Sequence, residues 1–213
     1  MNRGRLITIE GIDGAGKTTL AVGLLDALVA RGIDVELLRE PGGVPAAERI
    51  RDLVIDPDLH VTARTEALLY AAARAQLVEE AIEPRLSAGT WLLLDRFIDS
   101  SLAYQGGGRK LGIDAVRAIN EFAIRTAWPD RTLLLMIDPR LGRSRSRSRA
   151  SSPDRLEREE DDFFERTAHA YLELWSQDPE RIRKIDAGQP PQGVLAAALG
   201  ELADLLREPV AGP

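Results

Sequence analysis

The chain has 213 residues, 44% of them hydrophobic, and its 28 Lys and Arg residues against 34 Asp and Glu residues give a net charge of -6. This length and hydrophobic content fit one domain with a buried core, whereas the acidic balance argues against a general binder of nucleic acids or membrane surfaces. The absence of cysteine excludes a disulfide framework, a thiolate zinc site and a cysteine nucleophile, and no apolar stretch approaches the ~18 residues of a membrane span.

The N-terminus runs directly into an apolar segment over residues 6–9, which predicts a buried strand with no signal peptide before it and a cytoplasmic location. Residues 11–18 follow with the sequence GIDGAGKT, which has the spacing of a phosphate-binding loop, and residues 19–28 place apolar side chains at helical spacing. In such a loop the backbone N–H groups and the helix N-terminus bind phosphate oxygens. Lys17 can then reach the β- and γ-phosphates, and the Thr18 hydroxyl can join the Mg²⁺ shell. A glycine-rich turn with a chance lysine is disfavoured because the strand and the helix flank the loop.

A second strand is predicted over residues 35–38, and it leads into Arg39. Ligands of parallel sheets lie at the carboxyl ends of the strands, so Arg39 is placed where a second ligand can lie beside the phosphate loop. The alternative is a solvated loop residue.

Helices are predicted over residues 46–54 and 65–86. Tyr70 and Arg74 stand four residues apart on the second of these and so project from one side. A ring beside a guanidinium suits a flat ligand with polar edges, but spacing alone favours a core tyrosine with a surface arginine.

A third strand is predicted over residues 91–96, and its nearly continuous apolar character suits a central parallel strand. Asp95 at its carboxyl end fits a Walker B element that orients the Mg²⁺ shell, and Arg96 beside it can bind a second phosphate. The alternative is an ordinary ion pair at the end of a strand.

The rest of the chain continues the alternation of helices and strands. We expect a short helix from residue 99 to 105, a flexible break at 106–108, a helix over 114–126, strands over 132–138 and 181–185, a last helix over 194–207 and a disordered tail over 208–213. This alternation predicts an α/β fold with a parallel sheet covered by helices on both faces.

Arginines alternate with serines over residues 143–149. The residues alone support two interpretations equally. One is a solvated low-complexity or RNA-binding tract. The other is a basic lid that closes over a triphosphate.

Six motifs occur together: EGIDGAGKTT at 10–19, REPGG at 39–43, YAAAR at 70–74, DRF at 95–97, SSLAYQG at 100–106 and DRLE at 154–157. In this order and spacing they resemble bacterial thymidylate kinases of the P-loop nucleoside monophosphate kinase family, over roughly residues 5–205. The resemblance implies a five-stranded P-loop NTPase-type fold in a single domain over 1–213, with a lid at about 141–157. It also implies transfer of a phosphoryl group from Mg·ATP to dTMP, a step of dTTP biosynthesis, by a homodimer that binds neither nucleic acid nor membrane.

The resemblance also implies roles for individual residues. ATP is expected to bind at Gly11, Ile12, Asp13, Gly14, Ala15, Gly16, Lys17, Thr18 and Thr19, and Mg²⁺ at Thr18 and Asp95. The residues expected to bind dTMP are Asp13, Arg39, Tyr70, Arg74, Arg96, Ser101, Tyr104 and Gln105. Of these, Tyr70 matches the ring that stacks on thymine, and Tyr104 the ring that disfavours ribonucleotides. The residues expected to act in catalysis are Lys17, Asp95, Arg96, Arg147 and Arg149.

The family supplies its catalytic arginine either from the phosphate loop or from the lid. Ala15 precedes Gly16 here, so the resemblance implies that Arg149, with Arg147, takes this role. Three other classes fit less well. A regulatory GTPase should carry an Asn-Lys-x-Asp segment, a deoxynucleoside kinase has less need of both Arg39 and Arg96, and an RNA-binding module does not explain the phosphate loop.

Overall fold

The computed structural model describes residues 3–148, 155–156 and 158–207. Five parallel strands form one sheet with the order β2-β3-β1-β4-β5. The strands are β1 (Leu6–Glu10), β2 (Val35–Arg39), β3 (Trp91–Asp95), β4 (Arg131–Met136) and β5 (Ile182–Asp186). Strand β1 lies between β3 and β4. The connection that leaves β1 leads to β2 on one side of the sheet, whereas the connection that leaves β3 leads past β1 to β4 on the other side. Ligands are therefore expected at the carboxyl end of the central strand β1.

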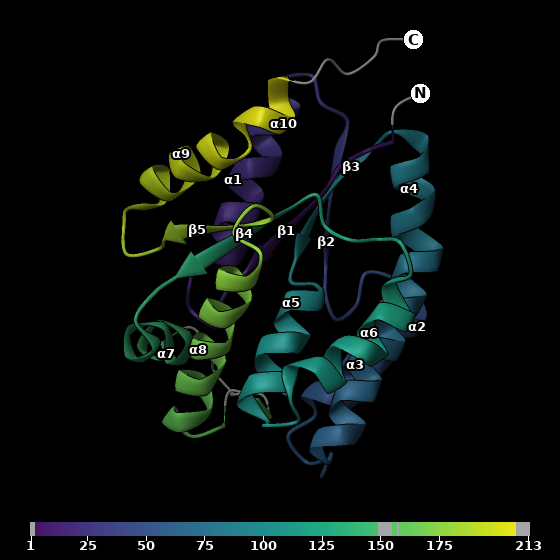
Figure 1. The fold of residues 1–213 in the computed structure, drawn as a ribbon, viewed down its shortest axis with the longest axis vertical. Coiled ribbons are helices and arrows are strands. Elements are labelled where there is room, and N and C mark those ends of the chain that lie inside the picture. The colour runs from purple at the N-terminus through teal and green to yellow at the C-terminus, as the bar shows by residue number, and fades with distance from the viewer. Residues whose placement is uncertain (1–2, 149–154, 157, 208–213) are drawn as a thin grey trace.

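Helices cover both faces of this sheet (Figure 1). They are α1 (Lys17–Val29), α2 (Pro45–Ile55), α3 (Ala63–Leu77), α4 (Glu83–Ala88), α5 (Ile98–Ser101), α6 (Ile113–Ile124), α7 (Pro139–Arg147), α8 (Asp161–Gln177), α9 (Pro191–Glu201) and α10 (Ala203–Arg207). Two π-helical segments, η1 (Val78–Ile82) and η2 (Leu102–Gly108), continue α3 and α5. The predicted α/β fold with a five-stranded parallel sheet is thus confirmed.

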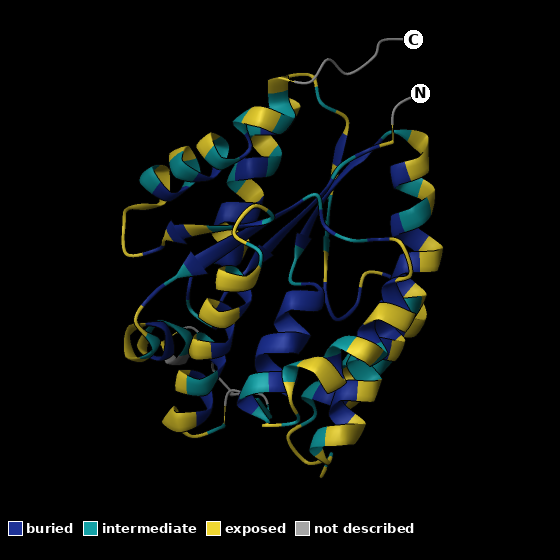
Figure 2. Ribbon diagram, viewed as in Figure 1, coloured by how far each residue is buried: buried dark blue, intermediate teal, exposed yellow. Residues whose placement is uncertain are grey.

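The core lies between the sheet and these helices. β1 is buried along its whole length, and Figure 2 shows the central strands and α5 as the most continuously buried elements. The buried strand predicted before the phosphate loop is therefore present. No helix within the described part of the chain combines the length and apolar character needed to cross a membrane.

Two predicted helices are interrupted. The helix expected over residues 65–86 consists of α3, η1 and α4 joined end to end, and the last helix divides at Leu202 into α9 and α10. The tail expected over 208–213 lies outside the described residues.

The flexible break predicted at residues 106–108 is wrong. These glycines belong to η2. Gly107 and Gly108 pack against α8, and Gly106 packs against Ile113 of α6. A Cβ on Gly107 would lie 2.4 Å from Cβ of Ala170, and one on Gly108 would lie 2.6 Å from the ring of Phe163. The glycines therefore allow two helical segments to approach closely. Their lack of a side chain serves close packing here and does not make the chain flexible.

Helix α8 is absent from the elements predicted from sequence. Its buried residues are Phe163, Phe164, Thr167, Ala170, Tyr171 and Leu174, which follow a helical period. The same signal was therefore available in the sequence. The helix matters for the site because it packs on η2 and carries Tyr171 below the phosphate loop.

Candidate active site

The predicted phosphate loop connects β1 to α1 at the carboxyl edge of the sheet. Gly14 and Gly16 have φ values of 79° and 95°, in the left-handed region that favours glycine. A Cβ on Gly14 would also lie 2.0 Å from the carbonyl oxygen of Gly142 in α7. The loop therefore turns tightly and at the same time makes backbone contact with the first part of the predicted lid.

Lys17 is the first residue of α1 and is 7% exposed. Its Nζ donates hydrogen bonds to the carbonyl oxygens of Gly11 (3.0 Å) and Ile12 (2.9 Å). Burial, with a smaller contribution from the charge of Arg96, lowers the pKa of Lys17 to about 8. The ammonium group is thus held inside the loop. It also lines the cavity over the loop, where a phosphate chain binds in loops of this kind.

Thr18 and Asp95 meet beside this loop. Thr18 Oγ1 donates to Asp95 Oδ2 over 2.8 Å. A hydroxyl and a carboxylate at this position fit Mg²⁺, which prefers oxygen ligands and takes few of them from the protein when phosphates supply others. No group of three or more His, Cys, Asp or Glu side chains that could hold a metal ion occurs among residues 3–148, 155–156 and 158–207.

Arg96 follows β3 with a φ of 72°, a strained value for a residue with a side chain. Its guanidinium donates to Oδ1 of Asp13 at 2.5 Å and to the carbonyl oxygen of Gly11 at 3.1 Å. Burial would raise the pKa of Asp13, but the charges of Arg96 and Lys17 and the hydrogen bonds from Tyr104 and Arg96 hold it below its usual value. The alternative of a simple Asp95–Arg96 ion pair is therefore wrong, because Arg96 pairs with Asp13 of the loop.

A polar cavity runs over the phosphate loop. It is lined by Asp13, Gly14, Gly16, Lys17, Thr18, Arg39, Glu40, Arg51, Asp95, Arg96 and Ser146. Arg39 is in this lining as predicted, although its half-exposed side chain also pairs with Glu48 at 3.0 Å. Arg51 was not predicted; its only sequence signal is a basic residue on the amphipathic helix after the second strand.

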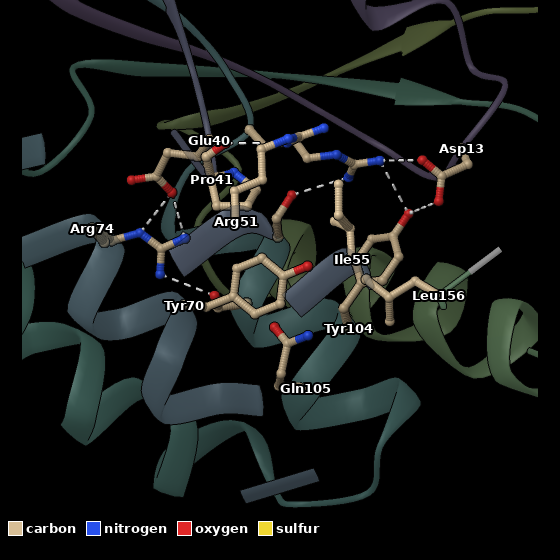
Figure 3. A pocket seen from close by; sticks show the side chains of 13 residues that line it. Asp13, Glu40, Pro41, Arg51, Ile55, Tyr70, Arg74, Tyr104, Gln105 and Leu156 are labelled. Atoms are coloured by element: carbon tan, nitrogen blue, oxygen red, sulfur yellow. Dashed lines mark hydrogen bonds and ion pairs between the residues drawn. The ribbon is translucent and has the colours of Figure 1, made fainter. Parts of the chain in front are cut away.

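A second cavity adjoins the first and shares Asp13, Glu40, Arg51 and Arg96 with it. Tyr70, Arg74, Ser101, Tyr104 and Gln105, all predicted from the family resemblance, line this cavity (Figure 3). Tyr70 and Arg74 come from α3, and the other three come from the α5–η2 segment. The ring of Tyr104 is anchored by a hydrogen bond from its hydroxyl to Asp13 at 3.1 Å.

Arg74 is 2% exposed, so the interpretation as a surface arginine is wrong. Its N–H groups are directed to oxygen atoms of Glu40 (2.9 and 2.6 Å), Ser101 (2.9 Å), Phe97 (2.9 Å) and Asn120. A guanidinium has five N–H donors, and these contacts use all of them. Since Ser101 Oγ accepts from Arg74, the hydroxyl proton of Ser101 remains for donation toward the pocket.

Glu10 lies below the loop and is the first residue of the EGIDGAGKTT motif, and the sequence predicts no role for it. Its carboxylate accepts hydrogen bonds from the Phe97 N–H (2.7 Å), the Ser100 hydroxyl (2.5 Å) and the Tyr171 hydroxyl (2.9 Å). Burial, reinforced by the charge of Asp99, raises the pKa of Glu10 to about 7. Glu10 thus ties the end of β1 to the segment that follows Arg96.

The first part of the predicted lid is the helix α7. Arg143 is buried, pairs with Asp161 at 2.6 Å and stacks 4.6 Å from the ring centre of Phe164, so it is not part of a solvated tract. Arg145 lines a third cavity with Gly14, Ala15, Gly16 and Thr19. Arg149, the side chain of Arg147 and most of the segment up to residue 157 lie outside what the structure describes, so their roles stay predictions.

Comparisons with known proteins identify the family to which the chain belongs. Residues 9–197 match the family model described as thymidylate kinase. The thymidylate kinase of Alkalilimnicola ehrlichii is 43% identical over 213 residues, covering 100% of this chain and 98% of that protein. Those of Halorhodospira halophila and Bordetella petrii are each 45% identical, over 212 and 207 residues, covering 99% and 97% of this chain and 98% and 99% of theirs.

Proposed function

Because the chain belongs to the thymidylate kinase family, we propose that it transfers the γ-phosphoryl group of ATP to the phosphate of dTMP, giving ADP and dTDP. One observation carries this proposal. Arg96, Asp13, Arg51 and Glu40 line both the polar cavity over the phosphate loop and the pocket that holds Tyr70 and Gln105. A phosphate in the first cavity and a base in the second thus belong to one continuous acceptor site.

The donor is proposed to lie on the other side of the loop. The third cavity shares Gly14 and Gly16 with the polar cavity and extends past Thr19 to Gln189, Pro191 and Val194. Its mixed lining suits a nucleoside, while the loop N–H groups and Lys17 suit the phosphates attached to it. In this arrangement Gly11, Ile12, Asp13, Ala15 and Thr18 complete the ATP site, as the family resemblance implies.

The acceptor phosphate needs no strong general base, because it is already an anion. The chemistry is therefore positioning and charge neutralisation. Arg39 and Arg96 are proposed to hold the acceptor phosphate, and Lys17 the transferred group. These cations offset the repulsion between the acceptor phosphate and the phosphate chain of ATP as the two approach in line. Bound Mg²⁺, held by Thr18 and Asp95, supplies further charge neutralisation at the phosphates.

The base is proposed to stack on Tyr70, with its polar edge facing Ser101 and Gln105 and lying beside the buried guanidinium of Arg74. Tyr104 is held in place by Asp13 and Arg96 and is proposed to lie under the sugar. A ring fixed in this way leaves little room for a 2′-hydroxyl. The lid arginines Arg147 and Arg149 are proposed to stabilise charge in the transition state, since the loop itself has Ala15 where an arginine can stand.

Two further properties belong to the same proposal. A homodimer is supported by large apolar side chains exposed on two contacting helices, Leu68 at 57% on α3 and Phe122 at 87% on α6. Sedimentation of the wild type against Phe122→Ser tests it, with a shift to monomer expected. A cytoplasmic location is consistent with the family, whose substrates are soluble nucleotides.

A panel of nucleoside monophosphates tests the activity. ATP consumption is measured with dTMP, dUMP, dCMP, UMP and CMP as acceptors, and with no acceptor to record hydrolysis. We expect dTMP to be preferred over UMP and CMP by at least about tenfold in kcat/KM. Equal rates with UMP would refute the acceptor, whereas consumption without any acceptor would indicate a hydrolase.

A further inference from the structure

A buried carboxylate lies directly behind the base pocket. Glu66 on α3 is fully buried and does not belong to the described lining of the pocket. It stands one helical turn before Tyr70, as Tyr70 stands one turn before Arg74, so the three residues share one face of the helix. The same face thus presents a ring and a guanidinium to the ligand and a carboxylate to the residues around it.

Three groups surround this carboxylate. Gln105 Nε2 donates to Glu66 Oε1 over 2.8 Å. Arg109 donates to both oxygens, at 3.1 and 3.0 Å, and Arg155 forms an ion pair with Oε2 at 2.6 Å. Two guanidinium groups supply the opposite charge that a buried carboxylate requires. An ionised carboxylate accepts hydrogen bonds and donates none, so it can face only the amino end of the Gln105 amide.

Glu66 influences the pocket through Gln105, which contacts Glu66 and also lines the pocket. With Nε2 turned to Glu66, the oxygen Oε1 is the end of the amide that remains for a ligand. Oε1 has no hydrogen bond within the described ranges of the chain, and Figure 3 shows the amide below the ring of Tyr70. A hydrogen-bond acceptor fixed at this place can accept from the N3–H of thymine. It repels the lone pair that cytosine has at N3.

We infer that Glu66 is a positioning residue for base selection, which acts by fixing the amide of Gln105 with its oxygen toward the acceptor base. The inference rests on the proposed function, since it concerns the selectivity of the same pocket. Without the carboxylate the amide is free to reverse, and its amino end then faces the base. The amino group of a reversed Gln105 amide cannot accept a hydrogen bond from the N3–H of thymine, because both groups are donors. The preference for thymine over cytosine is therefore reduced.

The same carboxylate joins the pocket to the end of the predicted lid segment. Arg155 also donates through Nε to the carbonyl oxygen of Val54 at 2.8 Å, and its backbone N–H donates to Ile55 at 3.3 Å. Ile55 and Leu156 line the pocket on the side of α2. Glu66 therefore links the walls of the pocket that come from α2, from η2 and from the end of the predicted lid segment. The fixed orientation of the Gln105 amide is one result of this linkage.

A double-mutant cycle tests the inference. The variants are Glu66→Gln, Gln105→Met and the pair together, and the readout is the ratio of kcat/KM for dTMP to that for dCMP, two acceptors with the same sugar and phosphate. Gln105→Met removes the amide but keeps a side chain of similar length. Glu80→Gln is the matched control, because Glu80 also accepts from a glutamine amide, Gln76 Nε2 at 2.8 Å, but at an exposed site far along the same helical run.

We expect Glu66→Gln to lower the ratio by about tenfold, mainly through a higher KM for dTMP, with kcat and the KM for ATP within about twofold of wild type. Gln105→Met should lower the ratio similarly, and adding Glu66→Gln to it should lower the ratio no further. Glu80→Gln should leave the ratio unchanged.

A ratio unchanged in Glu66→Gln, or a full further loss in the Gln105→Met background, would overturn the inference. Where Glu66→Gln does not fold, Glu66→Asp replaces it. The aspartate keeps the charge that Arg109 and Arg155 require but withdraws the carboxylate from the amide, and a wild-type ratio in the folded Glu66→Asp protein would overturn the inference equally. Failure of the wild type to phosphorylate dTMP would instead refute the proposed function.

Discussion

The hydroxyl of Thr18 donates a hydrogen bond to Oδ2 of Asp95 over 2.8 Å, and this contact joins the start of α1 to the end of β3. The two residues are 77 positions apart in the chain. Their contact depends on the pairing of β1 with β3, which places Ile9 beside Asp95 in the sheet. The sheet itself therefore fixes the position of the phosphate loop relative to the Asp95 carboxylate, which is proposed to bind Mg²⁺.

Replacing Asp95 with asparagine tests this relationship. The amide oxygen of Asn can still accept from Thr18, so the fold should be kept while the negative charge is lost. We expect kcat/KM to fall on the order of 10²-fold, with a higher Mg²⁺ concentration needed for half-maximal rate. Steady-state rates over a MgCl₂ series, with thermal unfolding as the check on folding, measure both effects. Wild-type rates at all Mg²⁺ concentrations would remove Asp95 from the metal site.

The arginines of the Arg-Ser run should separate into two groups. Arg143 packs on Phe164 and pairs with Asp161, so Arg143→Ala should lower the free energy of unfolding by about 1–2 kcal/mol. Arg149→Ala should instead lower kcat by about 10²-fold or more and leave stability unchanged, because a catalytic arginine acts in the transition state.

Parallel kinetics and urea unfolding of the alanine variants at 143, 145, 147 and 149 distinguish the two groups. Binding of dTMP alone should change little in any of them, since Arg39 and Arg96 are proposed to hold its phosphate. Retention of wild-type kcat by all four variants would show that the lid arginines do not act in catalysis.

The backbone contact between α7 and the phosphate loop predicts an effect of a single methyl group. A Cβ on Gly142 would lie 2.7 Å from the carbonyl oxygen of Asp13, so Gly142→Ala should push the helix off the loop and lower kcat about tenfold or more. Gly200→Ala is the matched control, because a Cβ there meets nothing within 4 Å. Alanine in that helix should raise stability by up to about 1 kcal/mol without changing activity. Equal activity of the two variants would contradict the contact.

The raised pKa of Glu10 predicts a pH dependence of stability. In the folded protein the pKa is about 7, above its usual value of 4.5, so between these two values the folded state binds more protons than the unfolded state. The free energy of unfolding that Glu10 contributes should therefore fall as pH rises from about 4.5 to 7.

Glu10→Gln removes this titration while keeping an oxygen that can accept from the Phe97 N–H. The difference in unfolding free energy between wild type and Glu10→Gln, measured by urea titration from pH 4.5 to 8, cancels the titration of most other groups. We expect it to shift in favour of the variant by on the order of 2–3 kcal/mol over this range. A difference that stays constant with pH would mean that Glu10 does not titrate in this window.

Much of the fold could be predicted because the signals are local. Apolar runs identify β1, β3 and β4, and helical spacing identifies most helices, within contiguous segments. Helix α8 carries the same signal and was missed, whereas the role of residues 106–108 could not be read locally. Three glycines in a row are typical of a break, and only the approach of α8 explains why they are helical here.

The sequence by itself determined the phosphate loop, because its strand, glycines, lysine and helix are neighbours in the chain and each conformation follows from the residue in it. It also placed Arg39, Asp95 and Arg96 near the loop, because parallel strands bring their carboxyl ends to one edge. Which side chains pair was decided only by the tertiary structure. Arg74 meets Glu40 across 34 residues and Tyr171 meets Glu10 across 161, and such contacts depend on how the helices pack on the sheet. The burial of Arg74 and the pairing of Arg96 with Asp13 follow from that packing, for which a single sequence carries no local signal.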